Sequence, residues 1–229
     1  MQGISLKQLS GARMLPPLNI LGAQNDNFHF ERELQARGWK CIAGTDEAGR
    51  GPLAGPVVAA CVSLSRDCDP APFLDSKKIS AKQRRHLYET LKSSGSSIGI
   101  GVVSHRRIDA INILQASLLA MKLAVFNHAA MAANSVDFLL VDGKFEIPLE
   151  IQQLALIKGE SKSGSIAAAS IIAKVYRDRI MEVLHHKYPH YDFLQHKGYP
   201  TRRHRQAIAR FGPCPFHRMT FKGVREFVA

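Results

Sequence analysis

The sequence has little of what marks secreted, disulfide-bonded or membrane proteins. Its 229 residues include four cysteines, with no C-x-x-C pair and no grouping with histidine at the spacing of zinc sites. We interpret these cysteines as separate thiols of a reducing compartment. Pro16 and Pro17 interrupt the N-terminal stretch, which makes it a poor signal peptide. No apolar run approaches the roughly 20 residues that span a bilayer. These absences predict a cytoplasmic protein.

Acidic residues are also scarce relative to basic ones. The chain has 31 Lys and Arg against 19 Asp and Glu, a formal net charge of +12. Such an excess favours a polyanionic partner, because lysine and arginine release condensed counterions when they contact phosphates. Charge alone does not separate nucleic acid from ribosomes or acidic membranes. With 45% hydrophobic and 22% charged residues, the chain has the composition of a globular domain.

The apolar pattern predicts an α/β domain preceded by an extension. Residues 1–38 are expected to form an N-terminal extension, partly irregular, with a short helix over 30–37. Residues 39–229 are expected to form one domain, which ends in a small helical part over about 185–229. We predict strands over 41–45, 57–64, 98–103, 136–141 and 154–157, and helices over 108–127, 165–184 and 202–211. This order indicates a mixed sheet flanked by helices.

Four acids fall at the ends of predicted strands. Asp46 and Glu47 follow the first strand, Asp142 ends the central strand, and Glu160 follows the last one. Any one of them could be an ordinary turn residue. Together they could bind hard cations such as Mg²⁺, which prefer oxygen ligands, and two such ions can stabilise an in-line displacement at phosphorus. The spacing makes a metal site plausible and leaves the turn interpretation open.

Five ordered motifs resemble one protein family. They are GTDEAGRGPLAGPVV at 44–58, LDSKK at 74–78, VDG at 141–143, KGESK at 158–162 continued by SIAAASIIAKV at 165–175, and HKGYPT at 196–201. Further matches are RDR at 177–179, His204, Gly212-Pro213 and His217-Arg218. In this order, over residues 40–221, they resemble ribonuclease HII, the bacterial type 2 ribonuclease H.

The resemblance implies a fold, a reaction and a metal site. The fold is a ribonuclease-H-like five-stranded mixed sheet flanked by helices, with the small C-terminal helical part closing over the substrate. The reaction is endonucleolytic hydrolysis of the RNA strand of RNA/DNA hybrids, and cleavage 5′ of ribonucleotides in duplex DNA. It uses two metal ions, Mg²⁺ or Mn²⁺, and leaves 3′-hydroxyl and 5′-phosphate ends. The family's metal ligands match Asp46, Glu47 and Asp142. The family's fourth catalytic acid is usually an aspartate, whereas this chain has Glu160, whose carboxylate lies one methylene further out.

The resemblance also implies which residues contact the nucleic acid. The backbone of Gly49, Arg50 and Gly51 is expected to meet the 2′-hydroxyl, which distinguishes RNA from DNA. Tyr199 is expected to lie against the sugar at the RNA–DNA junction, although a lone tyrosine is more often a packing residue. Phosphate contacts are expected from Lys77, Lys162, Lys174, Ser165 and Ser170. Neither a dinucleotide fingerprint nor a phosphate loop fits, because the required glycine spacing and the Gly-Lys-Ser/Thr ending are missing.

Alternatives remain open at this point. A zinc site is conceivable but has no supporting spacing among His185, His186, His190, His196 and His204. Asp178 is a rival to Glu160, although its position four residues after Lys174 favours a surface acid beside Arg177 and Arg179. Ribonuclease HIII shares the chemistry but would require an additional N-terminal substrate-binding domain. A non-catalytic hybrid-binding module on the same fold would not require all four acids.

The expected partner is a nucleic acid. It is an RNA/DNA hybrid or duplex DNA that contains ribonucleotides, bound by a monomer that makes no membrane contact. The sequence predicts neither the presence nor the absence of contact with a replication clamp or a polymerase.

Overall fold

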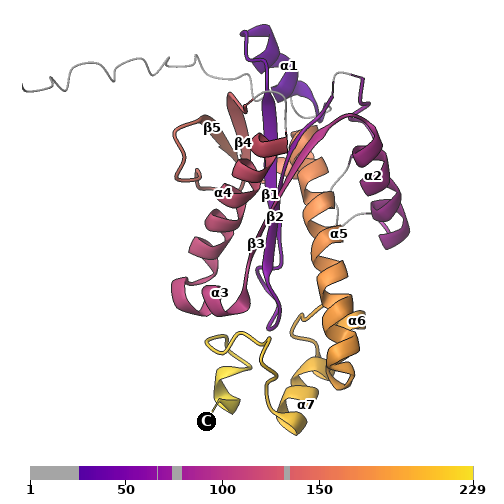
Figure 1. Cartoon of the computed structure of the whole chain (residues 1–229), viewed down its shortest axis with the longest axis vertical. Coiled ribbons are helices and arrows are strands. Elements are labelled where there is room, and N and C mark those ends of the chain that lie inside the picture. The colour runs from indigo at the N-terminus through magenta and orange to yellow at the C-terminus, as the bar shows by residue number, and fades with distance from the viewer. Residues whose placement is uncertain (1–25, 66, 74–78, 132–134, 229) are drawn as a thin grey trace, which may run out of the picture.

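The computed structural model describes residues 26–65, 67–73, 79–131 and 135–228 (Figure 1). Its strands are β1 (Ile42–Ala48), β2 (Val57–Ser63), β3 (Ser97–Val103), β4 (Phe138–Asp142) and β5 (Gln152–Leu156). Its α-helices are α1 (His29–Ala36), α2 (Ala81–Ser93), α3 (His105–Ile111), α4 (Ile113–Met131), α5 (Gly164–Lys187), α6 (Phe193–His196) and α7 (Arg202–Phe211). Short 3-10 helices are η2 (Gly159–Ser161), η3 (Pro189–Tyr191) and η4 (Arg225–Phe227). The motif at 74–78, with the predicted phosphate contact Lys77, lies outside the described residues.

The strands form one mixed sheet in the order β3-β2-β1-β4-β5. β2 runs antiparallel to both β1 and β3, whereas β4 runs parallel to both β1 and β5. The predicted mixed five-stranded sheet flanked by helices is confirmed. Because β1 and β4 are parallel neighbours, their carboxyl ends meet at one edge of the sheet, where α/β proteins build their sites.

Helices cover both faces of the sheet (Figure 1). In β2, Ala59 and Cys61 pack into the cluster that includes α4, whereas Ala60 and Val62 pack into the cluster that includes α5. Successive side chains of a strand point to opposite faces, so an uninterrupted apolar strand buries both. The central strands are therefore enclosed between two helical layers.

The start of α5 lies directly on β1. A Cβ added to Gly44 would come 2.2 Å from the backbone nitrogen of Ile166, a distance that no side chain tolerates. Glycine at this position therefore lets the helix approach the strand that carries Asp46.

Two helical segments differ from the sequence-based expectation. The single helix expected over 108–127 is divided into α3 and α4 at Asn112, which has a φ of 65°. The Asn112 Oδ1 accepts hydrogen bonds from the N–H groups of Leu114 and Gln115, so it starts a new helix. Helix α2 is absent from the prediction because its surface is mostly polar. Its sequence signal is the capping box formed by Ser80 and Gln83.

The first strand is longer than expected. The prediction ended it at residue 45, but β1 continues to Ala48 because Asp46 and Glu47 still pair with Ala60 and Ala59 of β2. The two acids are therefore the last part of a strand and not a turn, which fixes their backbone in the sheet.

The described part of the N-terminal extension packs on the domain. Phe30 and Leu34 of α1 are fully buried in a cluster with Ile42 and Ile166. Helix α1 thus shares a core with β1 and α5, while the domain boundary predicted after residue 38 stays a prediction.

Helix α4 is apolar for a structural reason. Within the described ranges, its stretch Ile113–Ala130 is the one segment long and apolar enough, by length and composition, to cross a membrane. It packs on β3 and β2, and a Cβ added to Gly101 would lie 2.0 Å from the Ala120 carbonyl oxygen. Ala116, Ala120 and Ala124 are fully buried in this contact. We therefore interpret α4 as a core helix.

The C-terminal part packs on the connection between β1 and β2. This part comprises the end of α5 and everything after it, and it lies beyond the lower tip of β1 in Figure 1. Leu53 donates its N–H to the Gly198 carbonyl at 2.8 Å, and its own carbonyl accepts the Arg218 N–H at 2.8 Å. Gly55 donates to the Phe216 carbonyl at 2.9 Å. These bonds join two regions that are distant in the sequence.

Candidate active site

Strand register brings the predicted acids together. Thr45 of β1 pairs with Val141 of β4 in parallel register, so Asp46 and Asp142 are the next residues on neighbouring strands. Glu160 follows β5 in the 3-10 helix η2, which packs beside β4. We call Asp46, Glu47, Asp142 and Glu160 the acid edge of the sheet.

Asp46 is the most buried member of the acid edge, at 5% exposure. Burial raises its pKa well above the ordinary value, and the neighbouring charges of Glu47 and Asp142 raise it further. Hydrogen bonds from the Ser170 side chain and from the Glu47 N–H, which lies 2.6 Å from Oδ1, act in the opposite direction. Ser170, expected at a phosphate, instead contacts this carboxylate.

Asp142 is coupled to Glu160. Its Oδ1 accepts the Gly159 N–H at 2.7 Å, and its side chain hydrogen-bonds to that of Glu160. Burial, and then the charge of Glu160, raises the pKa of Asp142 to about 7. A group with a pKa near 7 is partly protonated at neutral pH, so without cations Asp142 can hold the proton that a hydrogen bond to another carboxylate requires.

The acid edge has the donor chemistry for hard cations. In the part of the chain that the structure describes, no group of three or more His, Cys, Asp or Glu side chains is arranged to hold a metal ion. Glu47 instead pairs with Arg50, with 3.1 Å between Oε1 and Nη1, and Asp142 pairs with Glu160. Mg²⁺ needs only one or two carboxylates, because water and substrate phosphates complete its shell. Mutual repulsion that raises carboxyl pKa values is what a bound cation would relieve, so these residues fit such an ion.

Two buried arginines enclose the turn that follows β1. Arg218 donates to the carbonyls of Gly49 at 2.6 Å, Arg50 at 2.9 Å and Gly55 at 3.1 Å. Arg177 donates to the carbonyls of Pro56 at 3.0 Å, Ala54 at 3.1 Å and Lys197 at 3.0 Å. These two residues, which we call the arginine pair, are 0% and 1% exposed. Arg177, beside which Asp178 was expected as a surface acid, is therefore buried, while the Asp178 side chain is 19% exposed and pairs with Lys174.

The arginine pair orients the peptide groups of the turn. In a planar trans peptide, the C=O and the following N–H point in opposite directions. Holding the Gly49 and Arg50 carbonyls against Arg218 therefore directs the Arg50 and Gly51 N–H groups away from it. Gly49 has a φ of +101°, and a Cβ there would lie 2.1 Å from Arg177 Nε, so the turn requires glycine at this position. Sequence reasoning missed both positioning roles, although each arginine lies in a quoted motif.

Tyr199 lies against the same turn. A Cβ added to Gly51 would be 3.6 Å from Tyr199 Cε1, so the ring lies beside this glycine. Tyr199 is nevertheless 43% exposed. The C-terminal part thus brings an open aromatic ring to the edge of the Gly49–Gly51 turn. Sequence alone could not place this contact, because 148 residues (199 − 51) separate the two positions.

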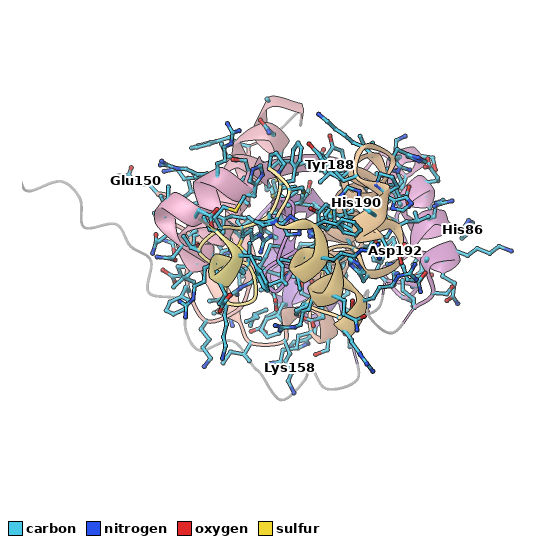
Figure 2. All side chains as sticks on the ribbon, turned by 90° about the horizontal axis from the view of Figure 1, so that it is seen from below. His86, Glu150, Lys158, Tyr188, His190 and Asp192 are labelled. Atoms are coloured by element: carbon cyan, nitrogen blue, oxygen red, sulfur yellow. The ribbon has the colours of Figure 1, made fainter. Side chains whose placement is uncertain are left out.

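Of the other residues predicted to contact phosphate, two are occupied by acidic partners within the protein and one is partly exposed. Ser165 is 1% exposed, and its hydroxyl donates to Glu31 Oε1 at 2.6 Å, so it faces the interior beneath α1. Lys174 forms an ion pair with Asp178 at 2.6 Å, and burial lowers the pKa of this lysine. Lys162 is partly exposed after η2. Lys158, one turn earlier, points out of the molecule in Figure 2.

Two of the five histidines considered for zinc, His196 and His204, have hydrogen-bond partners within the protein at both ring nitrogens. His196 donates from Nε2 to the Tyr191 carbonyl at 2.7 Å and accepts the Gly198 N–H at Nδ1, 3.2 Å away. His204 contacts the Tyr199 carbonyl and His217 through its two nitrogens. His190 lies near Asp192 at the C-terminal end, apart from His86 on α2 (Figure 2). The zinc hypothesis thus gains no ligand set within the described residues.

Comparisons with known proteins show the family to which the chain belongs. A family profile described as Ribonuclease HII matches residues 43–224. The ribonuclease HII of Desulfotalea psychrophila is 59% identical over 203 residues, covering 89% of this chain and 90% of that protein. The ribonuclease H2 structure from Pyrococcus horikoshii has a TM-score of 0.66 at 26% identity, covering 82% of this chain and 97% of that one. RNase HII of Archaeoglobus fulgidus, solved in complex with PCNA, has a TM-score of 0.63 at 28% identity, over 80% and 96%. The chain therefore belongs to the ribonuclease HII family.

Proposed function

We propose that this endoribonuclease hydrolyses the RNA strand of RNA/DNA hybrids and cuts on the 5′ side of ribonucleotides embedded in duplex DNA. The observation that carries the proposal is the position of the acid edge at the end of β1. The Gly49–Gly51 turn begins where β1 ends, separated from Asp46 and Glu47 only by Ala48, so the groups suited to phosphate chemistry lie near those suited to reading a sugar. The products would carry 3′-hydroxyl and 5′-phosphate ends.

Asp46, Glu47 and Asp142 would hold two divalent cations, Mg²⁺ or Mn²⁺, with Glu160 completing the site. When bound, such ions supply positive charge that stabilises the attacking and leaving oxygens of an in-line displacement. The protein orients the carboxylates: Ser170 holds Asp46, and the Gly159 N–H holds Asp142. Glu160 must release its hydrogen bond to Asp142 to contribute, which its extra methylene allows.

The turn and Tyr199 would recognise the sugar. The Arg50 and Gly51 N–H groups, directed outward by Arg218, are donors suited to the 2′-hydroxyl. Tyr199, at the side of Gly51, would stack against the next sugar and favour a ribonucleotide followed by DNA. An aromatic ring gives contact area without reading base identity, which suits an enzyme that must act at any sequence.

Phosphate contacts follow the available charges. Lys162 is the better candidate of the two described lysines, because the ammonium of Lys174 already has Asp178 as a partner. We leave Ser165 out of the proposed contacts because Glu31 accepts its hydroxyl. The four free cysteines suit a cytoplasmic setting, and we propose that the chain acts there as a monomer.

Cleavage of two matched substrates tests the proposal. One duplex carries a single ribonucleotide in DNA, and the other pairs a continuous RNA strand with DNA. We expect both to be cut with Mg²⁺ or Mn²⁺, neither with a chelator, and the first only on the 5′ side of the ribonucleotide. Mapping of the ends should give a 3′-hydroxyl and a 5′-phosphate. Cleavage that persists in chelator, or that leaves a cyclic phosphate, would contradict the proposed chemistry.

A matched pair of acid variants excludes a contaminating nuclease. Asp142→Asn should be inactive, whereas Glu150→Gln, an exposed acid eight residues later (150 − 142), should keep wild-type activity. Equal activity in the two variants would show that the measured cleavage does not come from the acid edge.

A further inference from the structure

Two buried histidines form a ring-to-ring hydrogen bond beneath the segment that carries Tyr199. His204 lies on α7 and His217 follows the Gly212-Pro213 turn, and their Nε2 atoms are 3.0 Å apart. Both rings are 0% exposed. We call them the histidine pair. Neither residue has a role in the proposed function, although both stand in the sequence motifs quoted above.

The backbone determines which nitrogen of each ring carries the proton. The Tyr199 carbonyl can only accept, so His204 Nδ1, 2.9 Å away, carries the hydrogen, and Nε2 of the neutral His204 ring accepts from His217 Nε2. His217 Nδ1 is then an acceptor for the Cys214 N–H at 2.9 Å, with the Cys214 carbonyl at 3.3 Å and Sγ at 3.1 Å also beside it. The result is one directed chain of hydrogen bonds from the Cys214 backbone to the Tyr199 backbone.

Both rings must be neutral for this chain to exist. A neutral imidazole has one donor and one acceptor, whereas a charged one donates from both nitrogens, so a charged His204 could not accept from His217 and a charged His217 could not accept the Cys214 N–H. Burial lowers the pKa of His204 to about 4 and that of His217 to about 3, which agrees with the geometry.

The surrounding contacts hold the backbone on both sides of Tyr199. Its carbonyl also accepts the Thr201 N–H at 2.8 Å, and its N–H donates to the His196 carbonyl at 2.9 Å. The His196 ring stacks on His204 with centroids 4.4 Å apart. The tyrosine ring projects from this fixed backbone toward Gly51.

We propose that the histidine pair is a positioning element that sets the placement of Tyr199 and thereby the preference for an RNA–DNA junction. The inference rests on the proposed function of Tyr199. The printed hydrogen bonds of the two rings go to each other and to the Tyr199 and Cys214 backbone, so the pair reaches Tyr199 through its carbonyl, while the neighbouring Arg218 holds the Gly49–Gly51 turn. A rigid ring with a donor on one side and an acceptor on the other spans the gap, which no aliphatic or hydroxyl side chain of this size can do.

Two variants of His204 separate positioning from packing. In His204→Asn the side-chain amide stands where Nδ1 stood and can still donate to the Tyr199 carbonyl. In His204→Gln the amide reaches the Nε2 position, which keeps the bond to His217 and loses the one to Tyr199. The measurement is the ratio of kcat/KM on the single-ribonucleotide duplex to that on the continuous hybrid, with Tyr199→Ala as the reference.

We expect His204→Gln to lower this ratio by about two- to tenfold, the effect of losing one hydrogen bond. His204→Asn, which keeps the bond to the Tyr199 carbonyl, should have a ratio close to that of the wild type. This difference between the two variants should remain even if both melt at the same reduced temperature. In Tyr199→Ala, adding His204→Gln should change the ratio no further, because the group being positioned is gone.

Each outcome bears on one hypothesis. If Tyr199→Ala lowers the ratio and His204→Gln leaves it at the wild-type value, the positioning role is wrong and the proposed function stands. If Tyr199→Ala leaves the ratio unchanged, the junction role of Tyr199 fails first. Equal loss in the Asn and Gln variants would indicate packing alone and overturn the inference. Should either variant not fold, nitrogen-15 spectra of the wild-type rings decide: hydrogen on His204 Nε2 or on His217 Nδ1 contradicts the chain.

Discussion

At the carboxyl edge of β1 and β4, buried acids face one another, whereas in the C-terminal part buried bases face backbone carbonyls. Asp46 and Asp142 have raised pKa values because burial and neighbouring charges oppose ionisation. Arg218, by contrast, donates four hydrogen bonds to carbonyls of the 49–56 connection, and the histidine pair has a partner at each nitrogen. The first region is electrostatically incomplete without cations, and the second is complete as it stands.

The difference separates two tasks within one site. A metal site gains from ligands that repel one another, because the repulsion is relieved only when cations bind. A recognition surface gains from groups that are already fixed, because nothing then has to be ordered on binding. Removing a carboxylate of the acid edge should therefore leave the stability unchanged or raise it. Removing a buried base of the C-terminal part should lower the stability.

The largest effect is expected at the acid edge. Asp46→Asn and Asp142→Asn should each lower kcat on the order of a thousandfold or more, because each removes a charge that the cations require. Without metal, the same variants should melt at or above the wild-type temperature, because a repelling buried carboxylate is gone. Paired cleavage assays and metal-free melting curves measure both. A clear fall in melting temperature would mean that the acids stabilise the fold without cations. The acid edge would then not differ from the C-terminal part in this respect.

The next effect is expected at the arginine pair. Arg218→Lys keeps the charge but loses the guanidinium fork, the two Nη groups that donate to the Gly49 and Arg50 carbonyls. We expect kcat/KM to fall by about ten- to a hundredfold, because hydrogen bonds from a charged group contribute roughly 1.5–3 kcal/mol each. The melting temperature should fall as well, unlike in the acid variants.

Arg210→Lys, an exposed arginine over the Phe211 ring, is the matched control and should keep activity and stability. If Arg218→Lys behaves like this control, the fork does not organise the turn.

A smaller effect is expected in the pH dependence of stability. Burial, and then its histidine neighbours, lowers the pKa of His217 to about 3, and burial lowers that of His204 to about 4. An unfolded histidine titrates near 6.5, so between about pH 6.5 and 4 the unfolded state binds more protons. The contribution of the two histidines to the free energy of unfolding should therefore fall as the pH falls through this window, by up to about 1.4 kcal/mol per pH unit per histidine, whereas the raised pKa values of Asp46 and Asp142 act in the opposite direction in the wild type and in a histidine variant alike.

Denaturant titrations at several pH values, for wild type and for the double variant His204→Gln with His217→Gln, measure this slope. The double variant should show a shallower dependence. Identical slopes would mean that the pair is not buried and neutral in solution.

The smallest effect concerns the salt dependence of duplex binding. Lys162→Ala should reduce the slope of log affinity against log salt by about one contact's worth. Lys174→Ala should reduce it less, because Asp178 already neutralises that ammonium at 2.6 Å. Binding isotherms of the metal-free protein at several salt concentrations measure both slopes. A larger change for Lys174 would mean that its ion pair opens when nucleic acid binds.

Much of the architecture follows from local sequence patterns. The strands, α5 and α7 lie close to their predicted positions, because apolar spacing and capping residues act over a few neighbours. For α7 the predicted and observed ranges agree at Arg202–Phe211, with Thr201 as the N-cap and Gly212 after the end. The strand-end acids were recognisable for the same reason, as charges placed where apolar runs stop.

Other features depend on which segments meet in space. Strand β1 extends through Glu47 because β2 offers paired backbone groups there, which the residues of β1 alone do not reveal. Arg177 and Arg218 resemble ordinary surface cations in the sequence, yet all their printed carbonyl partners except Lys197 lie more than a hundred residues away along the chain. A backbone carbonyl has no residue identity, so no pattern of side chains announces that it will accept a buried guanidinium.

The sequence by itself therefore determined the fold class, the family motifs and the candidate acids, because periodicity and residue chemistry are local properties. Only the tertiary structure decided that Ser165 serves Glu31, that Lys174 serves Asp178, and that Tyr199 lies against Gly51. The physical reason is competition: a polar side chain takes whichever partner the packed chain brings within reach, and that choice is made only after the helices and strands have assembled.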